Sequence, residues 1–275
     1  MSSKGEGARI RLLVLDVDGT LLDSRHSITE RVRASVRETA EAGVHVALGS
    51  ARGPAGLRPV ARQLGIEGHA VAFSGALLCQ LGPSPPAVVL GSQRMDLGPA
   101  RWVVRRAREL HISVGWWDLE HWSVPDLDGP VMREAAIIEV EPRVEDLASL
   151  ALPPFKLQCM VPPGAIERLR MLRAELPAGC AAQFSNPNYL EVFSPSTDKA
   201  HAVLELGTIL GCSAGEISAI GDGENDIAML RAVGLGVAVS NARPAVIEAA
   251  TWVTTSNDED GVAVALERMR CRGLF

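Results

Sequence analysis

The 275-residue sequence has no long hydrophobic run and no excess of positive charge. No apolar run reaches the ~18 residues that a membrane-spanning helix requires, and residues 1–9 lack the apolar centre of a secretion signal. With 27 basic and 33 acidic residues the net charge is −6, which provides no global basic field for nucleic acid or an anionic membrane. We therefore expect a cytoplasmic protein whose partners include neither nucleic acid nor a membrane.

Cysteine and histidine are also sparse, and neither is grouped. The five cysteines never form a Cys-x-x-Cys pair, which argues against a disulfide framework and against a structural zinc site. The six histidines show no metal-ligand spacing. The sequence thus predicts ordinary free thiols in a reducing compartment.

Apolar residues are plentiful, and they make up 47% of the chain, enough for one large domain or two smaller ones. Residues 10–15 form a nearly continuous apolar run that is too short for a typical helix and leads directly into Asp16 and Asp18. This pattern predicts a buried parallel strand that delivers both carboxylates into a loop, where open α/β sheets have their active sites.

The two carboxylates begin on the same side of the chain and repel each other unless a cation or a shared proton lies between them. A bound metal is therefore expected. Gly19 allows the backbone to turn sharply, and Thr20 is expected to hydrogen-bond within that turn. A calcium loop is a weaker interpretation, because apolar residues follow at once in place of further oxygen ligands.

A second apolar strand is predicted at residues 44–48, after a helix at residues 29–42. This strand, helix, strand order builds a parallel sheet, so Ser50 is expected at the same edge as Asp16. Its hydroxyl and the neighbouring amides can hold a phosphoryl oxygen. For an isolated serine the default is a role in starting the next helix, and the strand-end position is what favours a functional role here.

Two further polar groups lie in the last third of the chain. Lys199 is predicted in the first turn of a helix over residues 199–210, where a cation opposes the helix dipole and stability alone does not explain it. The loop of residues 221–226 follows an apolar strand and precedes an apolar helix start. It carries three carboxylates and an amide, at Asp222, Glu224, Asn225 and Asp226. Together with Asp16 these oxygens make a site for a hard cation.

Between these parts the composition changes. A proline-rich segment at residues 82–86 is typical of a domain boundary, and the chain re-enters the first domain near residue 194. Strands mixed with two helices predict an α+β lid with an open-faced antiparallel sheet. A hairpin of this lid carries three tryptophans whose flat surfaces suit a sugar, but tryptophans in a hairpin more often pack, and we expect packing for at least one of them. They are Trp116, Trp117 and Trp122.

Four ordered motifs resemble those of the haloacid dehalogenase-like phosphohydrolases, and they cover essentially the whole chain outside the lid. The first, Asp16-Val17-Asp18-Gly19-Thr20, matches the family's Asp-x-Asp-Gly-Thr. The second, Ser50-Ala51-Arg52, keeps the hydroxyl and the arginine of the Thr-Gly-Arg that is usual in the branch with large lids, and the third is Lys199. The fourth, Gly221-Asp222-Gly223-Glu224-Asn225-Asp226, closely matches Gly-Asp-Gly-x-Asn-Asp. Ser74 stands where this branch more often has asparagine.

The chain looks like the Cof-type, subclass IIB, sugar-phosphatase-like members of the family. This resemblance implies an α/β fold with a Rossmann-like parallel-sheet core in residues 1–82 and 194–275. An inserted α+β cap domain of the C2B type is implied for residues 83–193. The implied activity is that of a Mg²⁺-dependent phosphoric monoester hydrolase. Its substrate would be a small-molecule phosphate ester, sugar phosphates first, and the chain would be a monomer or homodimer.

The resemblance also implies a role for each motif residue. Asp16 attacks phosphorus and forms an aspartyl-phosphate, while Asp18 protonates the leaving oxygen and later activates water. Asp16, the main-chain carbonyl of Asp18 and Asp222 hold Mg²⁺, with Asn225 and Asp226 in support. Ser50 and Lys199 complete the catalytic set. The expected phosphate and substrate contacts are Gly19, Ser50, Ala51, Arg52, Lys199 and Asn225.

Two other functions fit the same residues. A phosphosugar mutase would yield an isomerised sugar phosphate in place of free phosphate. A non-catalytic phosphometabolite-binding protein would keep the pocket, and the intact Asp18 argues against it.

Overall fold

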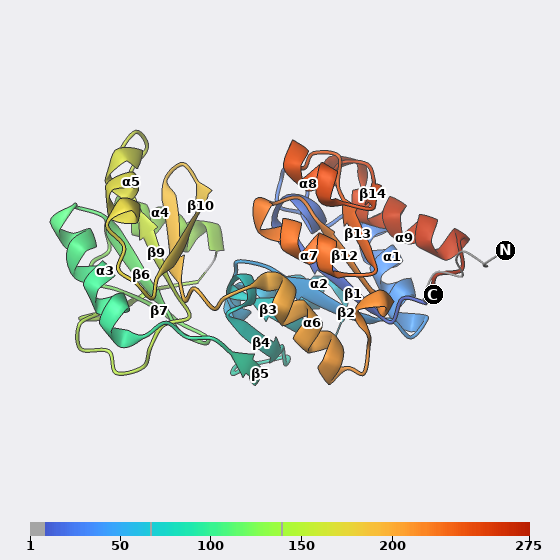
Figure 1. Ribbon diagram of the computed structural model, residues 1–275, viewed down its shortest axis with the longest axis horizontal. Helices are drawn as coiled ribbons and strands as arrows, with labels where there is room; N and C mark the ends of the chain where they lie inside the picture. The colour runs from blue at the N-terminus through green and yellow to red at the C-terminus, as the bar shows by residue number, and fades with distance from the viewer. Residues whose placement is uncertain (1–8, 67, 139) are drawn as a thin grey trace.

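The computed structural model describes residues 9–66, 68–138 and 140–275, which form two lobes, each built on its own β-sheet (Figure 1). The larger lobe has an eight-stranded sheet, in which the first six strands in spatial order pair in parallel and each of the last two pairs antiparallel with the strand before it. Its order is β14 (Trp252–Val253), β13 (Leu235–Ala238), β12 (Ile217–Gly221), β1 (Leu12–Asp16), β2 (His45–Gly49), β3 (His69–Ala72), β4 (Leu77–Gln80) and β5 (Val88–Ser92).

Helices cover both faces of this sheet, as expected when parallel strands are joined by helical crossovers. One group packs together as α1 (Glu30–Glu41), α2 (Pro54–Leu64) and α9 (Gly261–Cys271). The other group packs together as α6 (Lys199–Ile209), α7 (Ile227–Ala232) and α8 (Pro244–Ala249). None of the described helices has the length and apolar content needed to cross a lipid bilayer.

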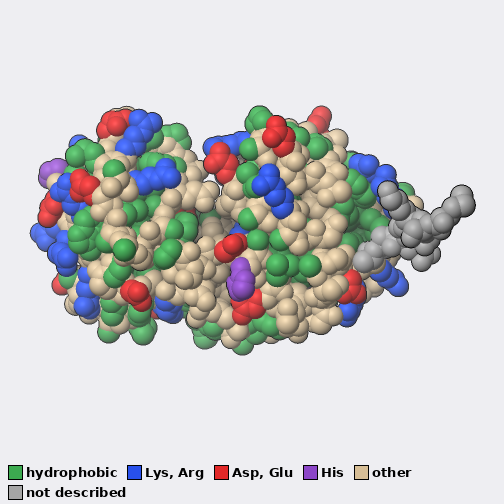
Figure 2. Space-filling model, in the orientation of Figure 1, with side chains coloured by type: hydrophobic (Ala, Val, Ile, Leu, Met, Phe, Trp, Pro, Cys, Tyr) green, Lys and Arg blue, Asp and Glu red, His purple; other side chains and the backbone are tan. Residues whose placement is uncertain are grey.

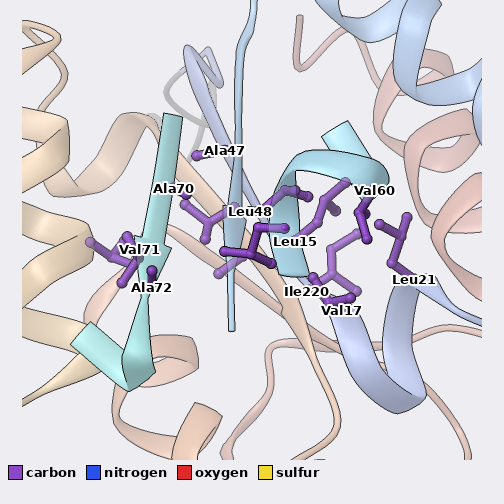
Figure 3. Packing of buried hydrophobic residues seen from close by; sticks show 14 of the residues in the cluster. Leu15, Val17, Leu21, Ala47, Leu48, Val60, Ala70, Val71, Ala72 and Ile220 are labelled. Atoms are coloured by element: carbon purple, nitrogen blue, oxygen red, sulfur yellow. The ribbon is translucent and has the colours of Figure 1, made fainter. Parts of the chain in front are cut away.

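The strand predicted before Asp16 is β1, and it lies at the centre of the sheet between β12 and β2. Its residues Leu12 to Leu15 are at most 1% exposed, because helices cover them on both sides. Leu15 packs with Leu48 of β2 and Ile220 of β12 in the main hydrophobic core (Figure 3). Burying a leucine contributes about 1.5–3 kcal/mol, so this central strand is a rigid support for the loop that follows it.

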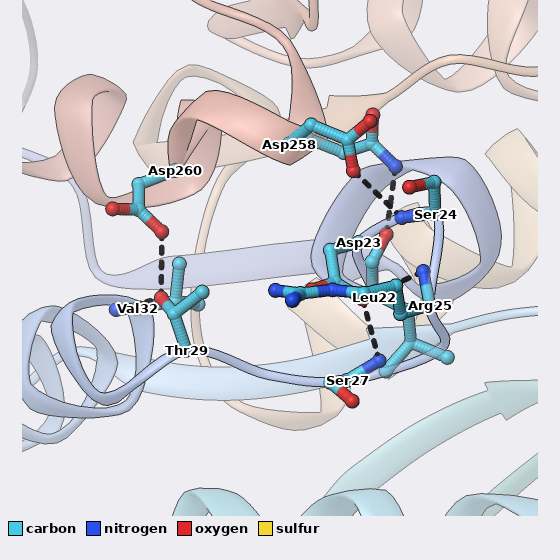
Figure 4. A network of polar contacts seen from close by, with 10 residues as sticks. Leu22, Asp23, Ser24, Arg25, Ser27, Thr29, Val32, Asp258 and Asp260 are labelled. Atoms are coloured by element: carbon cyan, nitrogen blue, oxygen red, sulfur yellow. Dashed lines mark hydrogen bonds and ion pairs between the residues drawn. The ribbon is translucent and has the colours of Figure 1, made fainter.

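The segment after β1 is held by the other end of the chain (Figure 4). Ser24 donates its backbone N–H to Asp258 at 2.7 Å, and the Thr29 hydroxyl donates to Asp260 at 2.6 Å. Thr29 also caps α1, since its side-chain oxygen accepts the N–H of Val32 at 3.2 Å. These contacts fix the path from the first strand into the first helix.

The smaller lobe has a six-stranded sheet, antiparallel except for its last pair. Its order is β10 (Ala181–Asn186), β11 (Tyr189–Phe193), β9 (Lys156–Met160), β6 (Ser113–Trp117), β7 (Trp122–Val124) and β8 (Arg143–Val144). Its helices are α3 (Leu97–Glu109), α4 (Gly129–Ile138) and α5 (Ile166–Ala174). The described part of this lobe therefore has a third helix, α4, where two helices were expected. The sequence does not indicate α4 because this helix begins with Gly129-Pro130, a pair that is more typical of a turn.

One strand lies on the other side of the expected domain boundary. β5 falls within residues 83–193, which were expected to form the lid, yet it pairs with β4 in the larger sheet. The proline-rich segment at residues 82–86 is thus the loop of a core hairpin, and the boundary expected after residue 82 is corrected to a point after β5. Proline and glycine mark turns of either kind, so composition alone does not separate a linker from a hairpin loop.

Candidate active site

Three neighbouring strands end in the polar residues that the sequence singled out. Asp16 is the last residue of β1, Ser50 follows β2, and Asp222 follows β12. Because β1 pairs in parallel with both of the other strands, all three residues emerge at the same edge of the sheet. This is the carboxyl edge, where ligand sites of open α/β sheets lie.

The turn of residues 17–21 turns the chain sharply at Gly19, which has φ +81°. A Cβ at this position would lie 2.5 Å from Asp222 Oδ2, so both the backbone conformation and the available space require glycine. Thr20 does not hydrogen-bond within its own turn as expected, and its hydroxyl donates to Asp222 Oδ1 at 2.8 Å. Asn241 donates to the Gly19 carbonyl at 2.8 Å. The turn is therefore fastened to the loops that follow β12 and β13.

Lys199 connects the strand tips. Its ammonium donates to Asp16 Oδ1 at 2.7 Å and to Asp226 Oδ1 at 2.5 Å, and the lysine is only 3% exposed. Asp198 caps the helix that positions it, accepting the N–H groups of Ala200 and His201 at 2.7 and 3.2 Å. A cation in the first turn of a helix is thus held by two buried carboxylates, which outweigh the unfavourable helix dipole.

Burial and mutual repulsion perturb these groups. Burial, then the charge of Asp226, raises the pKa of Asp16 well above its ordinary value, although Lys199 opposes the shift. Burial also raises the pKa of Asp222, with the Thr20 hydrogen bond acting in the opposite direction. For Lys199, burial disfavours the charged form, but the two carboxylates raise its pKa overall. The site therefore concentrates negative charge that a single ammonium neutralises only in part.

Asp226 organises the loop after β12 and is fully buried. Its Oδ2 accepts the backbone N–H groups of Asp222 and Gly223 at 3.1 and 2.9 Å. Oxygen atoms of Asp16, Asp222 and Asp226 lie within 4.8 Å of one another, a spacing that one metal ion can bridge. Asn225, which immediately precedes Asp226 in this loop, lines the cavity described below.

Asp18 and Ser50 lie beside this cluster. Arg52 holds both oxygens of Asp18, with Nε donating to Oδ2 at 2.9 Å and Nη2 to Oδ1 at 2.6 Å. The Asp18 side chain is 49% exposed, so this pair is a surface interaction of modest strength. Ser50 is 2% exposed, and its hydroxyl oxygen accepts the backbone N–H of Arg52 at 3.1 Å.

A cavity of about 320 Å³ opens over the strand tips, between the lobes. Figure 2 shows the surface hollowed where the two lobes meet. The larger lobe contributes Asp16, Asp18, Asp222 and Asn225 to its lining. The smaller lobe contributes Gln183, Phe184, Ser185, Glu191 and Phe193. A second hollow of about 290 Å³ adjoins it and shares Asp18, Ala51, Ser185 and Glu191.

The lid residues at this cavity were not predicted from the sequence, although a signal for them exists. In β9 and β11 the residues alternate. Leu157, Cys159, Leu190 and Val192 belong to the second hydrophobic cluster of the smaller lobe. The alternate positions include three polar residues that line the second hollow, Lys156, Gln158 and Glu191. Because Glu191 pairs with both Gln183 and Gln158, these polar side chains form a row across three strands.

The tryptophans of the lid hairpin are packing residues, as expected for at least one of them. Trp122 is fully buried and stacks on Trp117, with ring centroids 5.2 Å apart. Trp116 is 2% exposed and lies in the second hydrophobic cluster. Trp117 is 5% exposed and is the one member of the three that lines a described hollow.

The haloacid dehalogenase-like hydrolase family matches this chain over residues 13–266, so the protein belongs to that family. A provisionally named phosphatase of Haemophilus influenzae is 32% identical over 255 residues, which cover 92% of this chain and 95% of that protein. The 5-amino-6-(5-phospho-D-ribitylamino)uracil phosphatase YcsE of Bacillus subtilis is 26% identical over 268 residues, or 97% of this chain and 98% of that protein. The chain is thus a phosphatase, and the family implies a small-molecule phosphate ester as its substrate.

Solved structures agree with this assignment. A haloacid dehalogenase-like hydrolase from Bacteroides thetaiotaomicron has a TM-score of 0.86 and 29% identity, covering 95% of this chain and 100% of that one. A subclass IIB sugar phosphatase of the same superfamily has a TM-score of 0.80 at 20% identity, covering 96% and 100%. The second likeness concerns the fold alone. It confirms the expected α/β architecture.

Proposed function

We propose that this protein is a Mg²⁺-dependent phosphomonoesterase for small phosphorylated metabolites, with sugar phosphates as the first candidates. The observation that carries the proposal is the arrangement at the strand tips. Lys199 joins Asp16 to Asp226 beside Asp222, and a cavity bordered by both lobes opens directly above them. A carboxylate that attacks a phosphoryl group needs positive charge next to it, and this cluster supplies such a setting.

The residues fit a magnesium ion. The donors are carboxylate oxygens, which Mg²⁺ prefers, and they come from Asp16 and Asp222 with Asp226 next to them. Among the described residues, none donates a hydrogen bond to Asp16 Oδ2 or to Asp222 Oδ2, so each carboxylate keeps an oxygen for a cation. When bound there, Mg²⁺ would supply the charge that lets two buried carboxylates and a phosphate dianion approach one another. We assign Asp16, the Asp18 carbonyl and Asp222 as its ligands, and Asn225 and Asp226 as support.

The side chains then divide the reaction between them. Asp16 attacks phosphorus and becomes an aspartyl-phosphate. Lys199 and the Ser50 hydroxyl hold phosphoryl oxygens, with the backbone of Gly19 and Ala51 next to them. Asp18 protonates the leaving oxygen and then takes a proton from the water that hydrolyses the intermediate. Its exposure, in contrast to the buried Asp16, supports this division, since the two carboxylates have different environments.

Arg52 has a second role in this scheme. Its guanidinium holds both Asp18 oxygens, so Asp18 has to exchange this partner for the substrate before it can donate a proton. Such a half-exposed pair contributes at most about 1 kcal/mol, which a bound phosphate can replace. Arg52 is then free to bind the phosphate ester. We assign it to substrate binding on these grounds.

Sugar phosphates are favoured by the lid side of the cavity. Gln183 and Glu191 pair across β10 and β11, and Ser185, at the irregularity of β10 between Phe184 and Asn186, also lines the cavity. Amide, carboxylate and hydroxyl groups that line one side of a cavity suit the hydroxyl groups of a polyol, and Phe184 and Phe193 add apolar surface. The lid would close over the leaving group and exclude water until it departs.

The test is phosphate release from p-nitrophenyl phosphate and from a panel of sugar phosphates, with and without Mg²⁺. We expect wild-type turnover that requires Mg²⁺, and a loss of at least about 1,000-fold in Asp16→Asn, because an amide is a poor nucleophile. Asp258→Asn is the matched control, since this exposed carboxylate accepts a hydrogen bond from Ser24 and does not line the cavity. Retained turnover in Asp16→Asn would contradict the assignment. Isomerised sugar phosphate without free phosphate would identify a mutase, and binding without turnover a sensor.

A further inference from the structure

A lysine of the lid reaches the loop that would hold the phosphate. Lys156 of β9 is 5% exposed, and its ammonium donates to the backbone carbonyl of Ala51 at 2.9 Å. Ala51 belongs to the loop of residues 50–52, which we call the phosphate loop. The contact therefore joins the middle of the smaller sheet to the tip of β2 in the larger lobe.

The bonded carbonyl belongs to the same peptide plane that orients Ser50. In the trans peptide between Ala51 and Arg52, the C=O and the N–H point in opposite directions. Lys156 holds the oxygen end, and the Ser50 hydroxyl oxygen accepts the Arg52 N–H at the other end, at 3.1 Å. Since one lone pair of the Ser50 hydroxyl oxygen accepts this N–H, the hydroxyl proton points elsewhere and is available for a phosphoryl oxygen. This peptide plane therefore links the position of the lid to the orientation of the Ser50 hydroxyl.

The surroundings of Lys156 keep its ammonium in place. Glu191 of β11 is 8% exposed and accepts from the same ammonium at 3.0 Å. The rings of Trp117 and Phe73 lie 5.4 and 5.9 Å from the ammonium nitrogen, one from each lobe. A charged donor in such a dry setting makes a stronger hydrogen bond than it would in water.

We propose that Lys156 is a positioning residue that makes the phosphate grip of Ser50 depend on lid closure. This role of Lys156 rests on the proposed phosphatase function and adds to that function a coupling between the lobes. With the lid closed, Lys156 fixes the Ala51–Arg52 peptide and Ser50 presents its proton. When the lid opens, the carbonyl loses this donor, the peptide plane is free to rotate, and the loop releases phosphate.

The experiment is a double-mutant cycle between Lys156→Met and Ser50→Ala, with the dissociation constant of inorganic phosphate measured by calorimetry, with and without Mg²⁺. We expect Lys156→Met to weaken phosphate binding roughly 10- to 100-fold in the wild-type background. In the Ser50→Ala background the same change should weaken it less than about threefold, because the serine through which the lysine acts is gone. Equal losses in the two backgrounds, or no loss in the first, would overturn the proposal.

A purely structural role at the lobe junction is tested with a second ion pair. Arg58 of α2 holds Glu120 of the lid with two hydrogen bonds of 2.8 and 3.0 Å, away from the phosphate loop. Arg58→Met should lower the melting temperature, and any effect on phosphate binding should be the same with and without Ser50. If Lys156→Met does not fold, Lys156→Met/Glu191→Met removes both charges together and enters the same cycle. Turnover by the wild type tests the proposed function separately, and a wild type that binds no phosphate would overturn both.

Discussion

Replacing Lys199 by methionine tests how the charges at the strand tips are balanced. The variant keeps the length and apolar stem of the side chain but removes the ammonium that joins Asp16 to Asp226. Two buried carboxylates then face each other without a cation, with Asp222 close by. Removing one partner of a buried ion pair costs about 3–5 kcal/mol, because the remaining charge is left uncompensated.

The loss of stability in Lys199→Met should grow as the pH rises, because the buried Asp16 has a raised pKa. Burial raises the pKa of Asp16 well above its ordinary value even with Lys199 present, and loss of Lys199 removes an opposing influence. For an acid whose pKa is higher in the folded than in the unfolded state, the folded state binds the proton more tightly, so stability falls as the pH rises through this interval. The Lys199→Met variant should therefore be most impaired at pH 7 to 8. The difference from wild type should shrink toward pH 5, because protonated carboxyl groups need no counter-charge.

The assay is thermal unfolding in EDTA, followed by tryptophan fluorescence. A loss of 3–5 kcal/mol corresponds to a fall in melting temperature of roughly 10 °C for a chain of this size. Arg33→Met is the control, since it removes an exposed ion pair with Glu30 that contributes under about 1 kcal/mol. Mg²⁺ should raise the melting temperature of Lys199→Met more than that of wild type. A variant as stable as the control at pH 7.5, or one that loses further stability relative to wild type on acidification, would refute the reasoning.

Two further predictions concern a glycine and the cysteines. Gly19→Ala should lower phosphatase activity by at least about tenfold, since the added Cβ would lie 2.5 Å from Asp222 Oδ2. Gly43→Ala has a comparable φ of +90° and nothing within 4 Å, so it should cost about 1–2 kcal/mol of strain and leave kcat unchanged. Burial raises the pKa of Cys159 to about 12, so at pH 8 a thiol reagent should label Cys159 only after unfolding, whereas the exposed Cys271 should react at once. Mass spectrometry of the labelled peptides measures the labelling of both cysteines. Rapid labelling of Cys159 in the folded protein would contradict its burial.

The sequence predicted the edge of the sheet at which the site lies, because that depends on local patterns. An apolar run before Asp16, another before Ser50 and a third before Asp222 each give a strand, and the helix between the first two makes their order parallel. Residues that follow such strands must meet at the carboxyl edge. The placement of Lys199 in a first helical turn was predicted from periodicity in the same way.

Contacts between side chains of different loops were not predicted, since they depend on distances that no local pattern specifies. The Thr20 hydroxyl could hydrogen-bond within its own turn or to a neighbouring loop. It bonds to Asp222 because the chain after β12 passes next to it, and no local pattern specifies that path. Lys156 reads as an ordinary surface charge, because a lone lysine usually is one. Lys156 is buried because one lobe docks on the other, which places the Ala51 carbonyl oxygen 2.9 Å from the lysine ammonium nitrogen.

The site is also where the chain departs most from what stability favours. Lys199 opposes the dipole of its own helix, and Asp226 is fully buried next to two other carboxylates. Replacing buried charges by apolar residues of similar volume is often neutral or stabilising, so packing does not require this cluster. A cation would relieve the repulsion, and by mass action a ligand that binds only the folded state stabilises it. Metal binding at the proposed site would therefore be coupled to folding through the same oxygens. The stability cost that persists in the metal-free protein is what the proposed chemistry requires: a carboxylate kept short of positive charge until a cation and a phosphate ester arrive.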